Sequence, residues 1–246
     1  MGTGEGAQAF GWGLYFAGKR EIAQHYREAL SRDVMGDCEV EFSDGSVINC
    51  HGAHEWFVYS RTRHKWCVLE TRQLLYEKLR SGKRLNLTVP RSQPLVMEEQ
   101  ELLIPPYVLG AWLGDGTSSE PTICNSNNDL EVVTEIIAQG YNPTKQWVHK
   151  DTGVCYSRFD RLLGELRELN LLSNKHIPVQ YLRGSIQQRL ELLAGLIDTD
   201  GNYTETGGQY RFTNTNQVLI DSVVFLVSSL GFKVGKIQEY EPVLSS

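Results

Sequence analysis

The sequence of 246 residues predicts an α+β fold, in which a small all-β module precedes a larger domain with a duplicated helix-and-strand unit. An apolar pattern that ends in Asp-Gly occurs at residues 108–116 and again at residues 193–201. Each copy is followed by short strand-like segments and a further apolar helix pattern. Ahead of both copies, residues 38–60 alternate in the way expected for strands.

The composition fits a folded chain without membrane segments. Apolar residues make up 41% of the sequence, which is enough to bury a core, and no stretch is long enough to cross a membrane. The sequence has five cysteines and no signal peptide, which favours a reducing cytosol. We therefore expect the protein to be located in the cytoplasm of a bacterium or of a phage-infected host cell.

Residues 1–31 form a segment of their own. Residues 2–17 are too rich in glycine for a helix and lack the spacing of a phosphate-binding loop. The Gly-Leu-Tyr-Phe run at residues 13–16 faintly resembles the Gly-x-Tyr-Phe core of ADP-ribosyltransferase-like domains in phage polyproteins. Because thirty residues cannot make such an enzyme, we interpret residues 1–31 as a possible remnant of a host protein (an extein).

Residues 32–98 form the predicted all-β module. Residues 43–46, Ser-Asp-Gly-Ser, make a credible hairpin turn, and residues 42–46, 54–58 and 66–71 resemble the middle of an intein splicing (Hint) domain. The resemblance implies that His54 assists cleavage of the N-terminal splice junction by protonating the scissile amide. This chain departs from the family pattern at His51, where threonine is usual.

Other requirements of splicing are absent from the sequence. No opening block with a Cys or Ser nucleophile is evident before Asp33, and no His-Asn pair occurs anywhere. We therefore predict that this polypeptide cannot complete splicing, although its parent could. A zinc site is a rival interpretation of this module, but the spacing of its histidines and cysteines matches no standard arrangement, the residues being Cys50, His51, His54, His64 and Cys67.

Charge is distributed unevenly along the chain. Residues 56–97 hold nine Lys or Arg and two Asp or Glu, whereas residues 98–246 hold eleven and nineteen. The basic residues could follow phosphates, which would make binding salt-sensitive, or form an ordinary solvated surface. They include Arg61, Arg63, Lys65, Lys83 and Arg84. Residues 90–99 are the predicted linker to the next domain.

The two Asp-Gly patterns predict helices that end on Asp115 and Asp200. A helix C-terminus disfavours an anion, so a bound divalent cation would explain both placements. Small residues one turn apart, Gly110 with Gly114 and Gly195 with Thr199, allow the two helices to approach closely. Packing along this seam would bring the carboxylates together as a site for Mg²⁺.

The paired patterns resemble the two dodecapeptide motifs of LAGLIDADG homing endonucleases, and the resemblance covers residues 99–246. Residues 174–178, Asn-Lys-His-Ile-Pro, resemble an element of intein-borne members and imply that Lys175 is the active-site lysine. The family has a duplicated αββαββα unit, acts on double-stranded DNA, and would be monomeric here through the internal repeat. Asp115 and Asp200 would then hold the metal and be catalytic.

The segment after Asp200 predicts two strands around a turn at residues 206–208. Strand alternation puts Gln209, Arg211 and Thr213 on one face. The resemblance implies that such a face lies in the DNA major groove, where Arg and Gln suit guanine and adenine edges. An ordinary solvated face is the alternative.

Each strand segment leads into an apolar helix. The first would begin at a capping Ser126 and end at Gly140, with its stripe formed by Leu130, Val133, Ile136 and Ile137. The second would end at Gly231, with its stripe formed by Leu219, Val223, Leu226 and Leu230. Lys175 lies 60 residues after Asp115, so its counterpart in the second half would fall beyond Ser246. We therefore expect the second half to be truncated.

The function predicted from the sequence is metal-dependent double-strand cleavage of a specific DNA site by an endonuclease carried in a partial intein. One alternative is a DNA-binding module without cleavage, either a relic or a maturase-like protein. A second is an autoprocessing element. Loss of cleavage on replacing either aspartate by asparagine would separate the first two, because binding should survive both changes.

Overall fold

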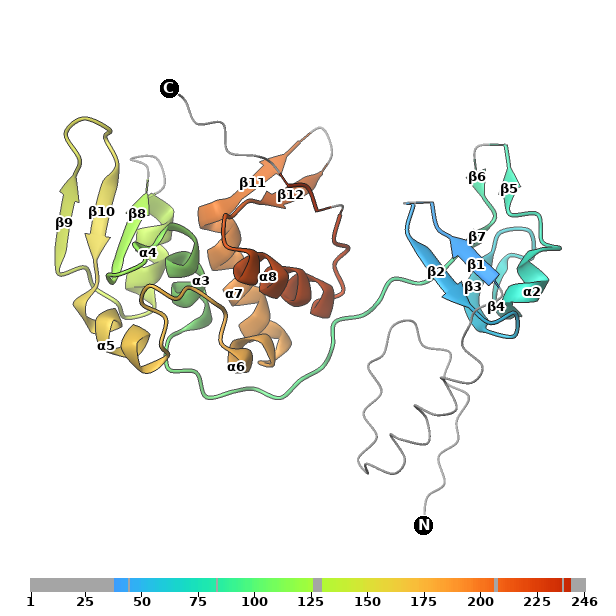
Figure 1. The fold of residues 1–246 in the computed structure, drawn as a ribbon, viewed down its shortest axis with the longest axis horizontal. Helices are drawn as coiled ribbons and strands as arrows, with labels where there is room; N and C mark the ends of the chain where they lie inside the picture. The colour runs from blue at the N-terminus through green and yellow to red at the C-terminus, as the bar shows by residue number, and fades with distance from the viewer. Residues whose placement is uncertain are drawn as a thin grey trace, which may run out of the picture. The chain divides into compact units, whose positions relative to one another are not determined.

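A computed structural model describes residues 38–43, 45–82, 84–125, 130–205, 208–235 and 237–239. The chain divides into two compact units, residues 1–92 and 93–246 (Figure 1). The predicted extein remnant, Lys83 and the capping Ser126 lie outside the described residues. Within the described part of the chain, no helix is both long enough and apolar enough to span a membrane.

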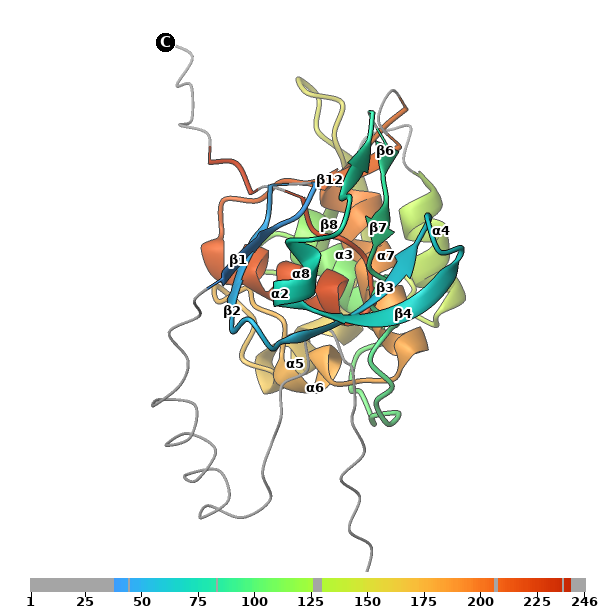
Figure 2. The same cartoon turned by 90° about the vertical axis from the view of Figure 1, so that its right-hand side faces the viewer.

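The first unit is built from short antiparallel strands. Strand β1 (Cys38–Glu41) pairs with β2 (Val47–Cys50), and β3 (Glu55–Ser60) lies between β4 (Lys65–Glu70) and β7 (Leu87–Thr88). A third pair joins β5 (Arg80–Ser81) to β6 (Arg84–Leu85), and a single helical turn, α2 (Thr71–Leu74), follows β4. Figures 1 and 2 both show β3 and β4 side by side.

The predicted alternation and hairpin turn in this unit are confirmed. The β1–β2 turn closes through the amide of Phe42, which donates to the carbonyl of Ser46 at 2.8 Å, and Gly45 adopts a φ of +81°. One face of the β3–β4 pair is buried, and its Trp56, Val58 and Leu69 form a core with Cys50 of β2. The indole of Trp56 donates to the buried hydroxyl of Thr71 at 2.8 Å.

The second unit alternates helices and strands. In chain order it contains α3 (Pro106–Asp115), β8 (Thr122–Asn125), α4 (Leu130–Ala138), β9 (Lys145–Val148), β10 (Cys155–Arg158), α5 (Asp160–Glu168), α6 (Val179–Leu182), α7 (Ile186–Asp200), β11 (Gly201–Thr204), β12 (Gln209–Phe212) and α8 (Gln217–Ser229). One antiparallel sheet has the order β8-β10-β9, and β11 and β12 form a separate hairpin.

Among the described residues between α3 and α4 there is one named strand, β8, where the resemblance predicts two. Gly116 makes a single bridge to Ile123 in place of the other strand. The amide of Thr117 donates to the carbonyl of Thr122 at 2.7 Å, and the chain turns between these residues. The turn limits antiparallel pairing on one side of this bridge, and α3, which ends at Asp115, limits it on the other.

The core of the second unit forms around α3, which is buried over most of its circumference. Its fully buried side chains include Val108, Leu109, Ala111, Trp112 and Leu113. The predicted stripe of α8 is confirmed, since Leu219, Val223, Leu226 and Leu230 are all buried.

The stripe predicted for α4 is correct only in part. Val133 and Ile136 are buried, whereas Ile137 is 40% exposed. Adjacent helix positions lie about 100° apart, so a neighbour of a fully buried residue can project to the solvent. Both helices end near the predicted glycines, Gly140 at φ +87° and Gly231 at φ +77°.

A fully buried arginine joins three segments of the second unit. The guanidinium of Arg189 in α7 donates to the carbonyl of Gly184 at 3.0 Å, to the carbonyl of Ser229 at 2.9 Å and also to the carbonyl of Leu95. The side-chain hydroxyl of Ser229 accepts a further bond at 2.6 Å. Burial lowers the pKa of Arg189. The predicted linker, residues 90–99, has no helix or strand, but Arg189 and Ser229 hold its middle at Leu95.

A buried tyrosine, Tyr181, forms hydrogen bonds with both backbone groups of Ile104, ahead of α3. The hydroxyl of Tyr181 donates to the carbonyl of Ile104 at 2.8 Å and accepts from the amide of Ile104 at 3.0 Å. Burial raises the pKa of Tyr181 to about 12. The neutral phenol is therefore the form that the fold stabilises.

Candidate functional site

Helices α3 and α7 touch along a seam of backbone atoms. A Cβ added to Gly110 would lie 2.4 Å from the carbonyl oxygen of Leu192. A Cβ added to Gly195 would lie 2.2 Å from the carbonyl oxygen of Tyr107. The close approach predicted from the small residues is therefore confirmed, and it excludes any larger side chain at these two positions.

Both helices end where the sequence predicts, at Asp115 and Asp200. A Cβ added to Gly114 would lie 3.5 Å from the carboxyl carbon of Asp200, so this carboxylate lies against the last turn of α3. The glycine seam therefore sets the two helix ends beside each other. An amide hydrogen bond of 2.7 Å from Asn214 holds one carboxylate oxygen of Asp200.

The amino group of Lys175 lies at the end of α3. It donates to the carbonyl of Leu113 at 2.9 Å and to that of Gly114 at 3.0 Å, and it lies 5.1 Å from the centre of the Trp112 ring. Burial lowers the pKa of Lys175 to about 8, although the nearby Asp200 and Asp115 carboxylates act in the opposite direction. The structure thus brings together the three residues that the sequence singled out.

Sequence reasoning missed two asparagines that support this group. Asn214 accepts a bond of 2.9 Å from the amide of Asn216, and the Asn216 side chain donates to the carbonyl of Lys175 at 2.7 Å. Asn216 also caps α8 by accepting from the amide of Leu219 at 3.3 Å. An Asn ahead of an apolar stripe is a visible capping signal, but nothing in the sequence pairs Asn214 with Asp200.

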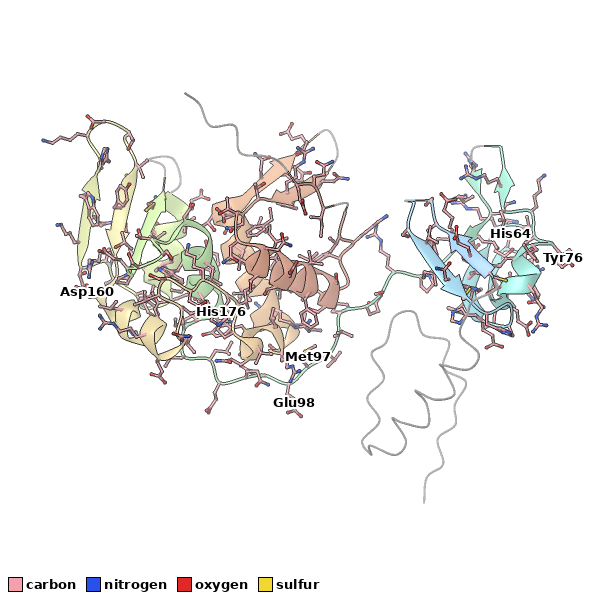
Figure 3. The ribbon with its side chains drawn as sticks, in the orientation of Figure 1. His64, Tyr76, Met97, Glu98, Asp160 and His176 are labelled. Carbon is pink, nitrogen blue, oxygen red and sulfur yellow. The ribbon has the colours of Figure 1, made fainter. Side chains whose placement is uncertain are left out.

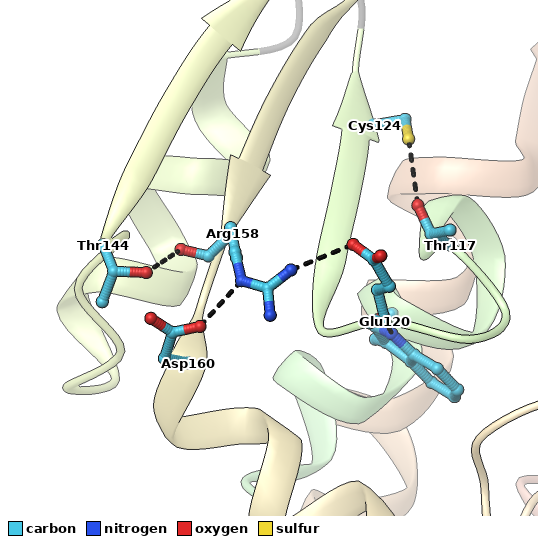
Figure 4. Close-up of polar contacts among 7 residues, drawn as sticks. Thr117, Glu120, Cys124, Thr144, Arg158 and Asp160 are labelled. Carbon is cyan, nitrogen blue, oxygen red and sulfur yellow. Dashed lines mark hydrogen bonds and ion pairs between the residues drawn. The ribbon is translucent and has the colours of Figure 1, made fainter.

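Two further side-chain contacts involve α3 and the segment that follows it. The Tyr107 hydroxyl of α3 donates to the Asp198 carboxylate of α7 at 2.9 Å and so ties the helices together. Burial raises the pKa of the Cys124 thiol, the bond to Thr117 lowers it and the Asp115 carboxylate raises it further. Figure 4 shows the 3.7 Å contact between Cys124 and Thr117.

The β11–β12 hairpin presents an exposed polar face. Gln209 and Arg211 are exposed, and their antiparallel partners are Thr204 and Asn202. Thr213 follows the strand, is exposed, and its amide bonds to the carbonyl of Asp200 at 3.4 Å. Directly opposed residues share a face, so Asn202 and Thr204 extend the predicted polar face.

The opposite face of this hairpin is also exposed. Tyr203 is 53% and Tyr210 67% exposed, and their rings lie 4.9 Å apart. Phe212, in contrast, packs against the core. The hairpin therefore projects from the unit, with its polar face open to a partner.

The other sheet carries an exposed strand of mixed character. All four residues of β9 are exposed, and Trp147 stacks on Tyr156 with ring centres 5.2 Å apart. Lys145 places its amino group 5.2 Å from the Trp147 ring. Arg158 of β10, in contrast, is held by Glu120 at 3.0 Å and Asp160 at 2.7 Å (Figure 4).

His54 belongs to the first unit, whereas Asp115 and Asp200 belong to the second. Its carbonyl accepts from the amide of Thr71 at 2.8 Å and from the hydroxyl of Thr71 at 3.2 Å. Its exposed ring packs edge-on to Trp56, with centres 4.7 Å apart. Across the described residues no group of three or more His, Cys, Asp or Glu side chains could hold a metal.

Comparisons with known proteins relate parts of the chain to two groups. Residues 187–241 match the family of LAGLIDADG-like domains. A replicative DNA helicase DnaB from Mycobacterium intracellulare is 38% identical over 215 residues, and the match takes in 79% of this chain. The chain spans only 34% of the length of that relative. The match is longer than the second unit, so it extends into the first.

Two solved structures of the homing endonuclease I-DmoI also align with this chain, one of mesophilic variants and one of a complex with DNA and Ca. Each shows 16% identity and a TM-score of 0.36 over 52% of this chain, and the aligned parts are 76% and 72% of those chains. The segment that contains α7, the β11–β12 hairpin and α8 is, by its family match, similar to LAGLIDADG-like domains.

Proposed function

We propose that this chain is a site-specific DNA endonuclease of the LAGLIDADG type, which uses a divalent cation, Mg²⁺, to break both strands of double-stranded DNA. One observation carries the proposal. Two helices packed along a glycine seam end side by side on Asp115 and Asp200, with the amino group of Lys175 at the same end. The family match over residues 187–241 supports it.

The donor atoms fit the proposed cation. Asp115 and Asp200 offer carboxylate oxygens, the hard ligands that Mg²⁺ prefers. Two carboxylates without further protein ligands suit a cation that keeps several waters and takes phosphate oxygens from its substrate. When bound there, the cation would activate water and stabilise the leaving 3′ oxygen.

The roles of the side chains follow from their contacts. Asn214 holds one oxygen of Asp200 and so sets the rotation of the carboxylate. Lys175 is held by two α3 carbonyls and would place positive charge near the scissile phosphate. Asn216 joins the Lys175 backbone to the start of α8 and so keeps lysine and aspartate in register.

The β11–β12 hairpin would read the DNA sequence. A major groove admits a two-stranded ribbon, where Arg pairs with guanine edges and Gln with adenine edges. Arg211 and Gln209 are exposed on the polar face, and Thr213 lies at its end. The exposed β9 strand, with Lys145, would add contacts from the first half of the repeat.

An intein origin accounts for the remaining parts. The match to 34% of a replicative DNA helicase fits an element inserted in a host protein. In this proposal residues 1–31 are extein, residues 32–98 are a Hint fragment in which His54 assisted splicing, and residues 99–246 are the endonuclease with a duplicated αββαββα unit. The protein would act as a monomer in the cytoplasm of a bacterium or an infected host cell.

Cleavage of a randomised duplex library tests the proposal. The purified chain is incubated with Mg²⁺, and the cut ends are sequenced. We expect one recurring long site, cut by the native chain and by Asp221→Asn, whose carboxylate lies on α8 and bonds to Gln217 at 2.8 Å. Asp115→Asn and Asp200→Asn should bind this site without cutting it. Binding without cutting by the native chain would instead identify a DNA-binding module.

A further inference from the structure

The outer face of the β3–β4 pair in the first unit is aromatic and exposed. Strand alternation places Phe57 and Tyr59 of β3 opposite Val68 and Trp66 of β4. Phe57 is 40% exposed, and Trp66 and Val68 are each 47% exposed. We call these four residues the aromatic face. Exposed apolar side chains that gather on one face of a sheet are a candidate binding surface.

The three rings of the aromatic face already contact one another. Phe57 and Trp66 lie nearly parallel, with centres 5.0 Å apart and an angle of 15° between their planes. Tyr59 meets Trp66 edge-on at 5.5 Å. Rings that are already held by such contacts can receive a further ring with little loss of side-chain freedom.

Positive charge borders one end of the aromatic face. An open hollow at this end is lined by Tyr59, Arg61, His64, Trp66 and Thr88. His64, labelled in Figure 3, lies in the turn between β3 and β4. Arg63 is ion-paired with Glu77, but Arg61 makes no ion pair among the described residues.

The other end of the face is different. Glu55 lies opposite Glu70 there, and Arg72 pairs with Glu70. An anionic group would therefore lie at the Arg61 end, next to the rings.

We propose that the aromatic face binds a single strand of nucleic acid, with bases stacked on Trp66 and Tyr59 and a phosphate at Arg61. Aromatic platforms beside a positive groove bind single strands without regard to sequence. Duplex DNA hides the faces of its bases, so a single strand is the matching polyanion. Residues 56–97 hold nine basic and two acidic residues. This excess of positive charge favours a polyanion such as nucleic acid over an uncharged partner.

Fluorescence anisotropy with a labelled oligothymidylate tests this proposal on the full chain. The strand is about 20 nucleotides long, enough for one small binding module. EDTA is present, so any nuclease activity is suppressed. We expect Trp66→Leu, which keeps an apolar side chain but removes the ring, to weaken binding at least about fivefold, as loss of one base stack does. Tyr59→Leu provides a second variant should Trp66→Leu fail to fold.

Charge variants test the phosphate contact. Arg61→Gln should reduce the slope of log affinity against log salt by about 0.7, the amount for one phosphate of a single strand. Arg72→Gln is the matched control, since it removes the same charge at the opposite end of the face and should leave the slope closer to the native value. Equal losses in the two variants would mean nonspecific attraction and overturn the proposal.

Three further results separate the alternatives. Phe225→Leu, which removes an exposed ring of α8 in the second unit, should bind normally, and a loss there with none in Trp66→Leu would place the site elsewhere. A duplex that competes as well as the single strand would rule out base stacking. Concentration-dependent dimerisation that Trp66→Leu abolishes, without any oligonucleotide binding, would make a second copy of the chain the partner.

Discussion

The glycine seam between α3 and α7 allows a sharp test by a single methyl group. In Gly195→Ala the new Cβ would lie 2.2 Å from the carbonyl oxygen of Tyr107, 2.8 Å from the amide nitrogen of Ala111 and 3.1 Å from the carbonyl carbon of Gly110. All three are backbone atoms, which no change of rotamer can move aside. The helices must therefore separate by about 1 Å to restore ordinary contact distances.

Two effects of opposite sign determine the cost. Overpacking of this kind costs about 1–3 kcal/mol or more, whereas replacing a helical glycine by alanine returns about 1 kcal/mol. Because the clash is with backbone, the first effect should dominate, and we expect a net loss of about 1–2 kcal/mol. Gly164→Ala is the matched control, since Gly164 lies on the exposed side of α5 with nothing within 4 Å of an added Cβ.

Urea unfolding followed by circular dichroism measures both variants. Gly164→Ala should stabilise the second unit by about 0.5–1 kcal/mol, while Gly195→Ala should destabilise it. If the endonuclease assignment is correct, a displacement of about 1 Å at the aspartates should also lower cleavage on the order of 100-fold. A Gly195→Ala protein as stable as the native chain would refute the close backbone approach on which the site depends.

Three other predictions concern polar groups that are buried or partly buried. Arg189→Met should lower the free energy of unfolding in urea by about 2–4 kcal/mol, because it leaves buried carbonyls without donors. The control Arg183→Met changes an exposed arginine and should be nearly neutral. Equal free energies of unfolding for the two variants would contradict the role of Arg189 in joining the three segments. The pKa of Tyr181 is raised to about 12 in the folded protein, against about 10 in the unfolded chain. Tyr181 therefore contributes about 2–3 kcal/mol to the free energy of unfolding below pH 10, and this contribution is lost as the pH rises through 12. Tyr181→Phe should flatten the stability profile in that window, and an unchanged profile would contradict the assignment. Asn214→Ala should lower cleavage about 10- to 100-fold with unchanged DNA affinity, because Asn214 positions the Asp200 carboxylate. Asn216→Ala should chiefly lower the free energy of unfolding by about 1 kcal/mol, because the cap of α8 is lost. Weaker DNA binding by Asn214→Ala would argue against a positioning role.

Several elements could be predicted from the sequence because their signals are local. The apolar period and the small residues at Gly110 and Gly195 suffice to predict two helices that meet closely, and the structure confirms both. The positions of Asp115 and Asp200 at the helix ends follow from the same repeat. The β1–β2 hairpin follows from a turn sequence with glycine at its left-handed position, Gly45.

The tertiary structure alone decided how distant polar groups are paired. The sequence marked Lys175, but only packing shows that its amino group is bound by the carbonyls of Leu113 and Gly114. The partnership of Asn214 with Asp200, and the hold of Arg189 on Leu95, likewise have no pattern in the sequence. These contacts arise because burial leaves backbone and carboxylate oxygens that must find donors, and the donor is whichever side chain the packed fold brings within reach.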